Sequence, residues 1–385
     1  MADMQKCPYV NRCGGCHIGR ESYEEELAGK QKWIEENIGK YCKVNGILGM
    51  YYPYYYRNKV HAVFGHAKDG IVAGMYEEGT HDIVPVKNCL IEDKQAAAII
   101  ETATQLINSF KIWAYNEDTG RGVMRHILIR KGMSTKQIMV VIVTAGPEFP
   151  HKNNFVDELR KRHPEITTIV QNINGQDTTM VLGGKNKPLY GDGYIEDVLC
   201  GLRFRISPNS FYQINSAQTQ ALYKKAIQAA ELTGKETVID AYCGIGTIGM
   251  AMASKAGKVI GVELNAQAVK DAKANAKRNN INNIHFVNAD ATEYMTQMSE
   301  NSQRADVVVL DPPRSGTTEE FAKAVALVKP LRVVYVSCNP ETLGRDLEYF
   351  KKAGYRAKEA WGVDMFPFTG NVETVVCLFW QKSGD

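Results

Sequence analysis

The sequence lacks long hydrophobic runs, and none approaches the roughly 18 consecutive apolar residues of a membrane-spanning helix. Its first residues (M-A-D-M-Q-K-C) lack the apolar core of a secretory signal, so we expect a cytoplasmic protein without a membrane partner. An excess of one charge is also lacking, because 46 Lys and Arg stand against 43 Asp and Glu. Any polyanionic partner must therefore be bound by local patches rather than by the field of the whole molecule.

The 385 residues are 44% hydrophobic and 23% charged, which is typical of folded chains with two domains of ordinary size. From about Ser207 onward, β-branched apolar runs (T-V-I-D-A-Y, K-V-I-G-V-E, D-V-V-V-L-D, L-R-V-V-Y-V-S) alternate with helical stretches. This alternation predicts a parallel sheet covered on both faces by helices. We therefore predict an α/β protein with a Rossmann-like domain over residues 206–385 and a smaller α+β region over residues 1–205.

Local patterns in the first region predict its elements. A helix is expected from Ser22 toward Ile38, since three glutamates follow Ser22 within its first turn. A second helix is expected around Asp93 to Phe110. The runs R-H-I-L-I-R-K and Q-I-M-V-V-I-V-T predict two strands joined by a short polar turn.

The nine cysteines are an odd number, which argues against a disulfide framework. Cys7, Cys13 and Cys16 form C-x5-C-x2-C, and Cys89 lies in a second segment. Four such thiolates can hold zinc or a [4Fe–4S] cluster. The single C-x2-C knuckle favours the cluster, because zinc sites more often pair two knuckles. Cys42 is the alternative fourth ligand.

A glycine-rich loop directly follows the predicted strand T-V-I-D-A-Y. Gly244, Gly246 and Gly249 form G-x-G-x-x-G, in which glycines permit a tight turn and close approach of a ligand to backbone N–H groups. Glu263 ends the next predicted strand, where a carboxylate can accept both ribose hydroxyls. Asp290 follows the third strand, where an acceptor can reach an adenine amino group. The loop fits NAD(P), S-adenosylmethionine or a plain structural turn.

The exit of the fourth predicted strand distinguishes these ligands. Asp311 begins D-P-P-R, in which two prolines hold the chain extended and direct the carboxylate into the cleft at the sheet edge. A dehydrogenase has no use for this arrangement, whereas a methyltransferase acting on a flipped base needs such a grip on its hydrogen-bonding edge.

Cys338 directly follows the fifth predicted strand and is a candidate nucleophile. Carbon 5 of uracil becomes reactive only after a thiolate adds at carbon 6, and a base must later remove the carbon-5 proton. Glu373, at the start of a late apolar strand, is the best candidate for that base. The structural alternatives are a small buried side chain for Cys338 and a solubilising edge charge for Glu373.

Five motifs in order, N-S-F-Y-Q-I-N ending at Asn215, D-A-Y-C-G-I-G-T-I-G, D-P-P-R, S-C-N-P and G-N-V-E-T-V, resemble the RNA uracil-5-methyltransferase family over residues 205–385. The N-terminal C-P-Y-V-N-R-C-G-G-C resembles its iron–sulfur subset, which acts on 23S ribosomal RNA. Because Cys7 lies so early, the sequence is expected to lack the N-terminal β-barrel RNA-binding module of larger members.

The resemblance implies roles for individual residues. It makes Cys338 the nucleophile and Glu373 the proton acceptor in carbon-5 methylation of a flipped uridine. It implies a [4Fe–4S] cluster held by Cys7, Cys13, Cys16 and Cys89. The positions that it places at S-adenosylmethionine, or in the pocket shared with uracil, are Gln213, Tyr242, Gly244, Gly246, Glu263, Asp290 and Asp311, with Thr247 on the same loop.

Candidate RNA contacts come from basic residues. Arg57 and Lys59 match a short family motif beside stackable tyrosines, and Arg125 and Arg130 lie in a segment without acidic residues. Strand alternation puts Arg125 and Arg130 on opposite faces, which weakens a shared patch. Solvated surface charge is the alternative for each of these residues.

Other functions remain open at this point. They are a tRNA uridine-5 methyltransferase, a cytosine-5 or amino methyltransferase, and a catalytically silent iron–sulfur RNA-binding protein. Cytosine chemistry on RNA employs a second cysteine beside the D-P-P-R position, and amino methylation an aromatic residue after the prolines; this chain has Pro312, Pro313 and Arg314 there. We expect a monomer.

Overall fold

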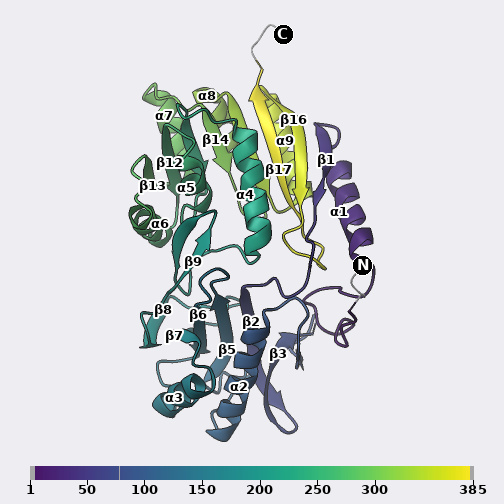
Figure 1. Cartoon of the computed structure of the whole chain (residues 1–385), viewed down its shortest axis with the longest axis vertical. Coiled ribbons are helices and arrows are strands. Elements are labelled where there is room, and N and C mark those ends of the chain that lie inside the picture. Colours follow the sequence, from purple (N-terminus) through teal and green to yellow (C-terminus); the bar gives the residue numbers. More distant parts are fainter. Residues whose placement is uncertain (1–4, 78, 382–385) are drawn as a thin grey trace. The chain divides into compact units, whose positions relative to one another are not determined.

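The computed structural model describes residues 5–77 and 79–381, which divide into two compact units. Unit 1 takes in the residues up to Ser22, Tyr52–Leu199 and Phe204–Ser216. Unit 2 takes in Tyr23–Tyr51, Cys200–Arg203 and the residues from Ala217 onward. Figure 1 labels their elements.

Unit 1 is built on a seven-stranded sheet with the order β4-β3-β2-β5-β6-β7-β8. Alternate residues of its central strands pack against two helices, as Val60, Ile127 and Val140 do, and form one buried core. The helices are α2 (Lys94–Ser109) and α3 (Lys152–Arg162). The strands are β2 (Lys59–Ala67), β3 (Gly70–Tyr76), β4 (Ile83–Val84), β5 (Met124–Lys131), β6 (Ile138–Thr144), β7 (Ile166–Ile173) and β8 (Lys185–Tyr190). A short hairpin follows, formed by β9 (Ile195–Leu199) and β10 (Leu202–Ile206).

Unit 2 is built on an eight-stranded sheet with the order β1-β16-β17-β15-β14-β11-β12-β13. Its strands pair in parallel except where β17 pairs with β15 and β16. The strands are β1 (Lys43–Leu48), β11 (Thr237–Ala241), β12 (Lys258–Glu263), β13 (Ile284–Asn288), β14 (Val307–Leu310), β15 (Arg332–Ser337), β16 (Tyr355–Val363) and β17 (Glu373–Trp380).

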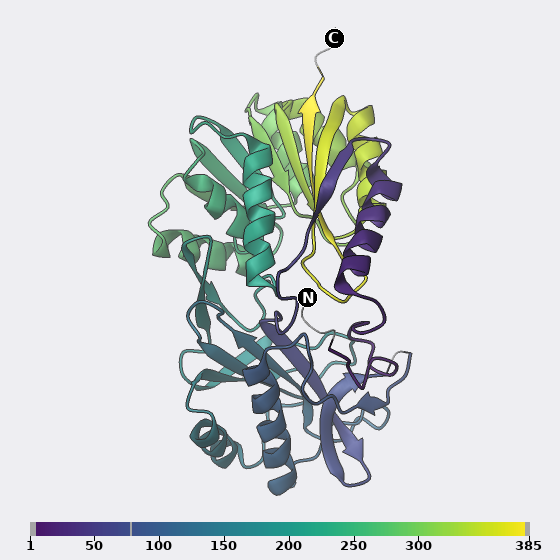
Figure 2. The same ribbon diagram turned by 45° about the vertical axis from the view of Figure 1, so that its right-hand side comes forward.

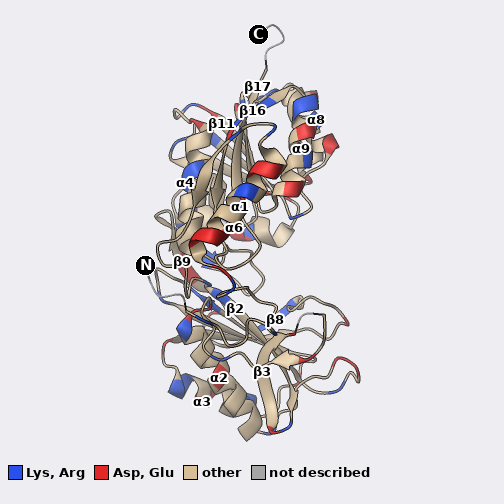
Figure 3. Ribbon diagram, turned by 90° about the vertical axis from the view of Figure 1, so that its right-hand side faces the viewer, with Lys and Arg blue, Asp and Glu red and all other residues tan. Residues whose placement is uncertain are grey.

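Helices cover both faces of this second sheet (Figure 1). One face carries α1 (Tyr23–Ile38), α7 (Ala291–Glu300), α8 (Glu319–Val328) and α9 (Pro340–Lys352), whose apolar residues share one core with the strands. The other face carries α4 (Ser216–Ala230), α5 (Thr247–Ala253) and α6 (Ala266–Arg278). Lys and Arg alternate with Asp and Glu along α1, α8 and α9, so these helices show mixed charge (Figure 3).

The structure confirms the predicted mostly parallel α/β sheet. Each predicted β-branched run forms one of the strands β11, β12, β14 and β15, and the runs around Val308 and Val334 are fully buried because helices cover both faces. The two predicted N-terminal helices are α1 and α2, and Asp93 caps α2 by accepting hydrogen bonds from the backbone of Gln95 and Ala96. The two strands predicted in the basic segment are β5 and β6.

The division between the units differs from a single boundary near residue 205. The early segment Tyr23–Tyr51 belongs to unit 2, where β1 pairs in parallel with β16 and α1 packs against α9. Figure 2 shows α1 and β1 beside the C-terminal strands. Ile34 and Ile38 of α1 have no exposed surface in this core. The period of the apolar residues predicted the helix, but a local pattern does not say against which distant sheet a helix packs.

Within the described ranges, no helix is long and apolar enough to pass through a lipid bilayer.

Candidate active site and cysteine cavity

The predicted nucleophile and the predicted base lie opposite each other at one edge of the sheet of unit 2. Strands β15 and β17 are antiparallel, and their register pairs Ser337 with Thr374. Cys338 comes one residue after this pair on its strand, and Glu373 comes one residue before it on the partner strand. Cys338 and Glu373 therefore occupy facing positions at the ends of two neighbouring strands.

Asp311 joins them from the next strand. Strand β14 pairs in parallel with β15, with Leu310 opposite Tyr335, so the residue after β14 leaves the sheet at the edge where Cys338 leaves it. The negative charge of Asp311 is close enough to raise the pKa of both Cys338 and Glu373. Three predicted site residues therefore meet at the carboxyl ends of β14 and β15.

Glu373 is a buried carboxyl group with unused hydrogen-bonding capacity. Its side chain is 3% exposed, and its Oε2 atom has no hydrogen-bond partner among the described residues. Burial raises its pKa first and the charge of Asp311 raises it further, while the Arg314 guanidinium opposes both. Burial also raises the pKa of Asp311. A carboxylate held in this way is a stronger base than one in water.

Cys338 is a half-buried thiol in a negative environment. Burial raises its pKa to about 11, with further increases from Glu373 and Asp311 and a decrease from Arg314. At neutral pH the resting group is therefore a thiol rather than a thiolate, and it must lose a proton before it can attack.

The loop after Asp311 is fixed by residues that the sequence analysis missed. Asp346 of α9 has no exposed surface and accepts hydrogen bonds from the backbone of Thr317 (2.7 Å) and the hydroxyl of Tyr335 (2.6 Å). A Cβ at Gly316 would lie 2.3 Å from the Asp346 carboxylate, so the loop is closely packed there. An aspartate at a core position between Leu343 and Leu347 is the sequence signal that could have identified it.

The predicted glycine loop joins β11 to α5 and requires its glycines. Gly244 and Gly246 have φ values of +55° and +81°, a region that side chains disfavour. A Cβ at Gly246 would lie 2.6 Å from the Phe286 ring, whereas one at Gly244 would meet open space. Tyr242, just before them, also has a positive φ (62°), and its hydroxyl lies 3.2 Å from that of Thr317.

Glu263 lies across from this loop and organises it. Its two carboxylate oxygens accept backbone hydrogen bonds from Gly244 (3.0 Å) and Asn265 (2.7 Å). Each carboxylate oxygen can accept a second hydrogen bond, so these contacts leave capacity for ribose hydroxyls.

The remaining predicted cofactor residues have structural contacts as well. Asp290 caps α7, with Oδ1 accepting hydrogen bonds from the backbone of Thr292 and Glu293. Thr247 begins α5, and its hydroxyl lies 2.7 Å from that of Tyr223. Gln213 belongs to unit 1, where its backbone carbonyl accepts a hydrogen bond from the side chain of Asn58.

The four predicted cluster cysteines line one cavity of about 790 Å³ in unit 1: Cys7, Cys13, Cys16 and Cys89. None of them forms a disulfide. They lie close enough to interact, since the charge of Cys7 raises the pKa of Cys13 and the charge of Cys16 raises that of Cys89, in each case after the larger effect of burial. Cys42, the alternative ligand, lies in the core of unit 2.

As placed in the described residues, no three His, Cys, Asp or Glu side chains converge tightly enough to bind a single metal ion. Arg57 also lines the cavity. Burial raises the pKa of Cys13 and Cys16, and the positive charge of Arg57 opposes this increase.

Two of the predicted RNA contacts lie inside unit 1. Arg125 is 2% exposed and pairs with Glu117 at 2.8 Å. Arg130 is 4% exposed and donates to the carbonyl oxygens of Pro208 and Ser210. Arg125 also donates to the carbonyl oxygens of Asn174 and Gln176. Both guanidinium groups are buried and hold parts of unit 1 together, which argues against RNA contact by either residue. A basic segment without acidic residues does not show which of its side chains are buried.

Arg57 and Lys59 are partly buried rather than fully exposed. Burial and the nearby Arg130 lower the pKa of Lys59 to about 8. RNA contact by Arg57 and Lys59 stays a prediction.

Comparison with known proteins gives concordant similarities. Residues 183–381 match the family model described as tRNA (uracil-5-)-methyltransferase. An uncharacterized RNA methyltransferase of Halalkalibacterium halodurans is 42% identical over 377 residues, which cover 97% of this chain and 82% of that protein. Another, from Caldanaerobacter subterraneus subsp. tengcongensis, is 42% identical over 376 residues, which cover 97% of this chain and 83% of that protein.

A solved structure extends this similarity to the fold. The crystal structure of Pyrococcus abyssi tRNA (uracil-54, C5)-methyltransferase in complex with S-adenosyl-L-homocysteine matches with a TM-score of 0.80 and 29% identity. The match covers 95% of this chain and 86% of that chain, so it includes parts of both units.

Proposed function

Because this chain belongs to the tRNA (uracil-5-)-methyltransferase family and is an S-adenosylmethionine-dependent RNA methyltransferase, we propose that it methylates carbon 5 of a specific uridine through a covalent bond between Cys338 and carbon 6. The observation that carries this mechanism is the placement of Cys338 opposite Glu373, a buried carboxyl group with an oxygen that no described residue hydrogen-bonds. The reaction needs a nucleophile and a separate base that reach the same uracil ring.

Cys338 opens the reaction. Once the thiol has given its proton to solvent, the thiolate sulfur adds to carbon 6 of the flipped uracil. The electrons of the carbon 5–carbon 6 double bond then move toward the carbon-4 oxygen as an enolate. Carbon 5 then carries the electron density that attacks a methyl group. S-adenosylmethionine, when bound, supplies that methyl group on a positively charged sulfur. The new carbon–carbon bond forms as the carbon–sulfur bond to the methyl group breaks.

Glu373 closes the reaction. Its carboxylate takes the proton from carbon 5, the carbon 5–carbon 6 double bond forms again, and the sulfur of Cys338 leaves as a thiolate. The raised pKa of Glu373 suits this task, because a base whose pKa lies near the working pH both exists in its ionised form and holds a proton well.

Asp311 has the role of holding the uracil in place. A uracil whose N3–H donates to the Asp311 carboxylate would be held beside the strand exit that carries Cys338. Since the N3–H donates and an ionised carboxylate only accepts, this contact also favours uracil over cytosine, whose N3 has no proton.

The residues that we assign to S-adenosylmethionine lie mostly at the carboxyl ends of the strands β11, β12 and β13. Gly244 and Gly246 would present backbone N–H groups to the cofactor, and Glu263 would accept ribose hydroxyls. Tyr242 and Asp290 border the same edge at the ends of β11 and β13, and Gln213 is assigned to it through the family motif. Support for these roles comes from the register of the strand ends and the positive φ values of the loop.

We assign the cysteine cavity to a [4Fe–4S] cluster with Cys7, Cys13, Cys16 and Cys89 as ligands. Each cysteine of such a cluster binds a different iron, so its thiolates need not converge on one point, and Arg57 offers a compensating positive charge on the cavity wall. The cluster would supply a covalent clip for the loops of unit 1.

The RNA target that we favour is 23S ribosomal RNA, on the basis of the N-terminal cysteine motif. A tRNA target is the second candidate, because the matching Pyrococcus abyssi enzyme is a tRNA (uracil-54, C5)-methyltransferase. Mapping 5-methyluridine in both RNA classes from cells with and without the gene decides between them. Arg57→Ala and Lys59→Ala should weaken binding of that RNA and reduce the slope of affinity against salt.

The test of the mechanism uses purified variants and RNA labelled with tritium at carbon 5. Cys338→Ala should abolish tritium release while S-adenosylhomocysteine still binds. Glu373→Gln should permit methyl transfer but retain the RNA on the protein, visible as a slowly migrating denaturation-resistant band. Full tritium release by Cys338→Ala would refute the mechanism, and failure of the wild-type chain to release tritium from any RNA would support a silent RNA-binding protein.

A further inference from the structure

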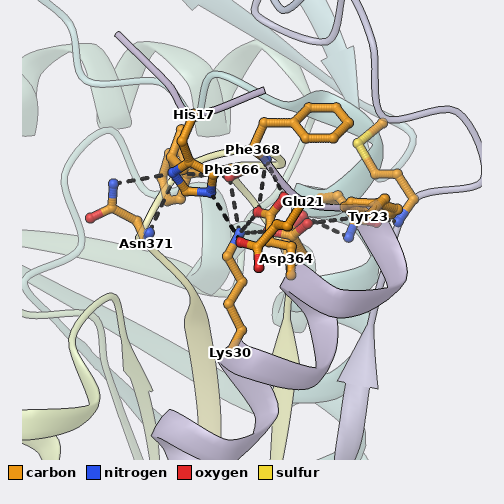
Figure 4. A network of polar contacts seen from close by, with 12 residues as sticks. His17, Glu21, Tyr23, Lys30, Asp364, Phe366, Phe368 and Asn371 are labelled. Carbon is orange, nitrogen blue, oxygen red and sulfur yellow. Dashed lines mark hydrogen bonds and ion pairs between the residues drawn. The ribbon is translucent and has the colours of Figure 1, made fainter. Parts of the chain in front are cut away.

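A buried polar network joins α1 to the loop between β16 and β17. Lys30 of α1 is 5% exposed, and its Nζ atom lies 2.5 Å from Glu26 and 2.7 Å from Asp364. The same Nζ donates to the carbonyl of Phe366 (3.2 Å), and the hydroxyl of Tyr23 donates to Asp364 (2.6 Å). Figure 4 shows Tyr23 and Lys30 converging on Asp364, which lies more than 300 positions away in the sequence.

Glu26 extends the network further along the loop. Its two carboxylate oxygens accept hydrogen bonds from the backbone N–H of Phe368, at 2.8 and 3.0 Å. Phe368 has a φ of +63°, a conformation that a phenylalanine adopts only when its surroundings hold it there. The side chain of Gln218 adds a hydrogen bond to the carbonyl of Asp364 (2.9 Å).

This loop ends at the proposed base. Val363, the last residue of β16, pairs with Glu373, the first residue of β17. Asp364 directly follows Val363, so the Lys30 ion pair lies one residue from the register partner of Glu373. Near the other end of the loop, Arg314 donates to the side chain of Asn371 (3.0 Å), two residues before Glu373. Both ends of the loop are therefore anchored.

Stability alone gives a weak reason for such a network. Two carboxylates share one lysine in the interior, and burial raises the pKa of Glu26 to about 7 in spite of Lys30. A buried ion pair often stabilises a protein no more than apolar residues of the same size, because both charges lose their hydration. The network does, however, fix the backbone on which Glu373 depends.

We propose that Lys30, together with Glu26 and Tyr23, positions the loop 364–372 so that Glu373 reaches the carbon-5 proton of the methylated adduct. These are positioning residues that act through Glu373, and the inference rests on the proposed function. They contribute to proton removal and elimination, while the addition of Cys338 and the transfer of the methyl group proceed without them. Displacing a catalytic group by about 1 Å can slow its step about 100-fold.

The test compares two steps of one turnover in the full-length protein. RNA labelled with tritium at carbon 5 reports proton removal, and a ¹⁴C-labelled methyl group reports methyl transfer. In Lys30→Met, which keeps an unbranched side chain of nearly the same length (one heavy atom shorter) and removes its charge, the rate of tritium release should fall about 100-fold. The rate of methyl transfer should change less than threefold, so that the methylated covalent adduct accumulates.

A matched control is Tyr355→Phe, which removes a buried hydrogen bond to the carbonyl of Pro330 at the opposite end of β16. It should change both rates equally. Tyr23→Phe is a milder variant that keeps the ion pairs, and it decides the question if Lys30→Met does not fold; it should also slow tritium release selectively. Equal loss of both rates in Lys30→Met or Tyr23→Phe, or no loss, overturns the inference.

Glu373→Gln in the same experiment separates this inference from the proposed function. If Glu373→Gln accumulates the adduct and the network variants do not, the positioning role is wrong and the mechanism stands. If Glu373→Gln accumulates no adduct, the mechanism itself is wrong.

Discussion

At the scale of single residues, the site brings together three acidic groups whose negative charges would repel each other. A thiol beside two carboxylates is a poor resting nucleophile, since each negative charge disfavours the thiolate. In the mechanism that we propose, the same two carboxylates are the general base and the acceptor for the N3–H of uracil. The raised pKa should slow oxidation and alkylation of Cys338 at neutral pH, because both reactions need the thiolate.

The pKa of Cys338 makes a direct prediction for its reactivity. Because its pKa is raised to about 11, the thiolate fraction increases as pH rises and is still small at pH 9. Alkylation of Cys338 by iodoacetamide, followed by mass spectrometry of its peptide, should accelerate about tenfold for each pH unit from 7.5 to 9.5. The exposed Cys200 serves as an internal reference. A plateau below pH 9 would contradict the raised pKa.

Glu373→Gln should change that profile in a known direction. Removing the charge of Glu373 removes one cause of the raised pKa of Cys338, so the thiolate fraction at a given pH increases. Alkylation at pH 9, where Glu373 of the wild-type chain is largely ionised, should therefore be faster in the variant. Slower or unchanged alkylation would show that the two side chains do not interact.

Glu263 makes a prediction for the cofactor. Glu263→Ala removes the acceptor assigned to the ribose and should weaken S-adenosylhomocysteine binding by about 1–3 kcal/mol in isothermal titration. Asp290→Asn is a useful comparison, because asparagine also caps helices and should preserve α7. Unchanged affinity in Glu263→Ala would disprove the ribose assignment.

Sequence motifs pointed to the residues to which we assign the chemistry, but not to the residues that hold them. Cys338, Glu373 and Asp311 follow apolar strands in short motifs, and the ends of neighbouring parallel strands lie at one edge of a sheet. Asp346 and Lys30 act on distant parts of the chain from the buried faces of helices. Their partners depend on tertiary contacts, which no local pattern contains.

At the scale of elements, the packing of the loop between β11 and α5 depends more on Gly246 than on Gly244. Gly246→Ala forces a methyl group into the Phe286 ring in an unfavourable conformation, and should lower the free energy of unfolding by more than about 2 kcal/mol. Gly244→Ala meets open space and should cost about 1 kcal/mol. Urea unfolding of the two variants measures the difference, and equal losses would contradict this packing.

Elements were predictable from the sequence where burial is uniform. A short run of β-branched residues such as V-V-V-L in β14 predicts a buried strand, because buried helices are longer and less rich in valine. The burial of Arg125 and Arg130 was not predictable, because it depends on carbonyl groups of distant loops that accept their hydrogen bonds.

At the scale of the whole molecule, unit 2 is assembled from separate stretches of the chain. A fragment starting at residue 206 lacks α1 and β1, which leaves β16 without its parallel partner and α9 without its apolar neighbours Ile34 and Ile38. We expect residues 206–385 alone to melt at a lower temperature than unit 2 does in the full chain, and to aggregate.

Adding the segment 23–51 as a separate peptide should restore part of that stability. A peptide carrying Ile34→Asp and Ile38→Asp is the matched control, because it keeps β1 and loses the apolar face of α1. Thermal melting followed by circular dichroism measures both. A fragment that melts as cooperatively as the full chain without any peptide would show that the early segment is dispensable.

The pairing of β1 with β16 also sets an order of events on the ribosome. Strand β1 is synthesised near the start of translation, and its partner begins at Tyr355, about 300 residues later. At 5–20 residues per second, the nascent strand waits roughly 15–60 s for that partner. Throughout this interval its hydrogen-bonding edge is available to chaperones and to neighbouring nascent chains, so the yield of active enzyme should depend on the speed of elongation.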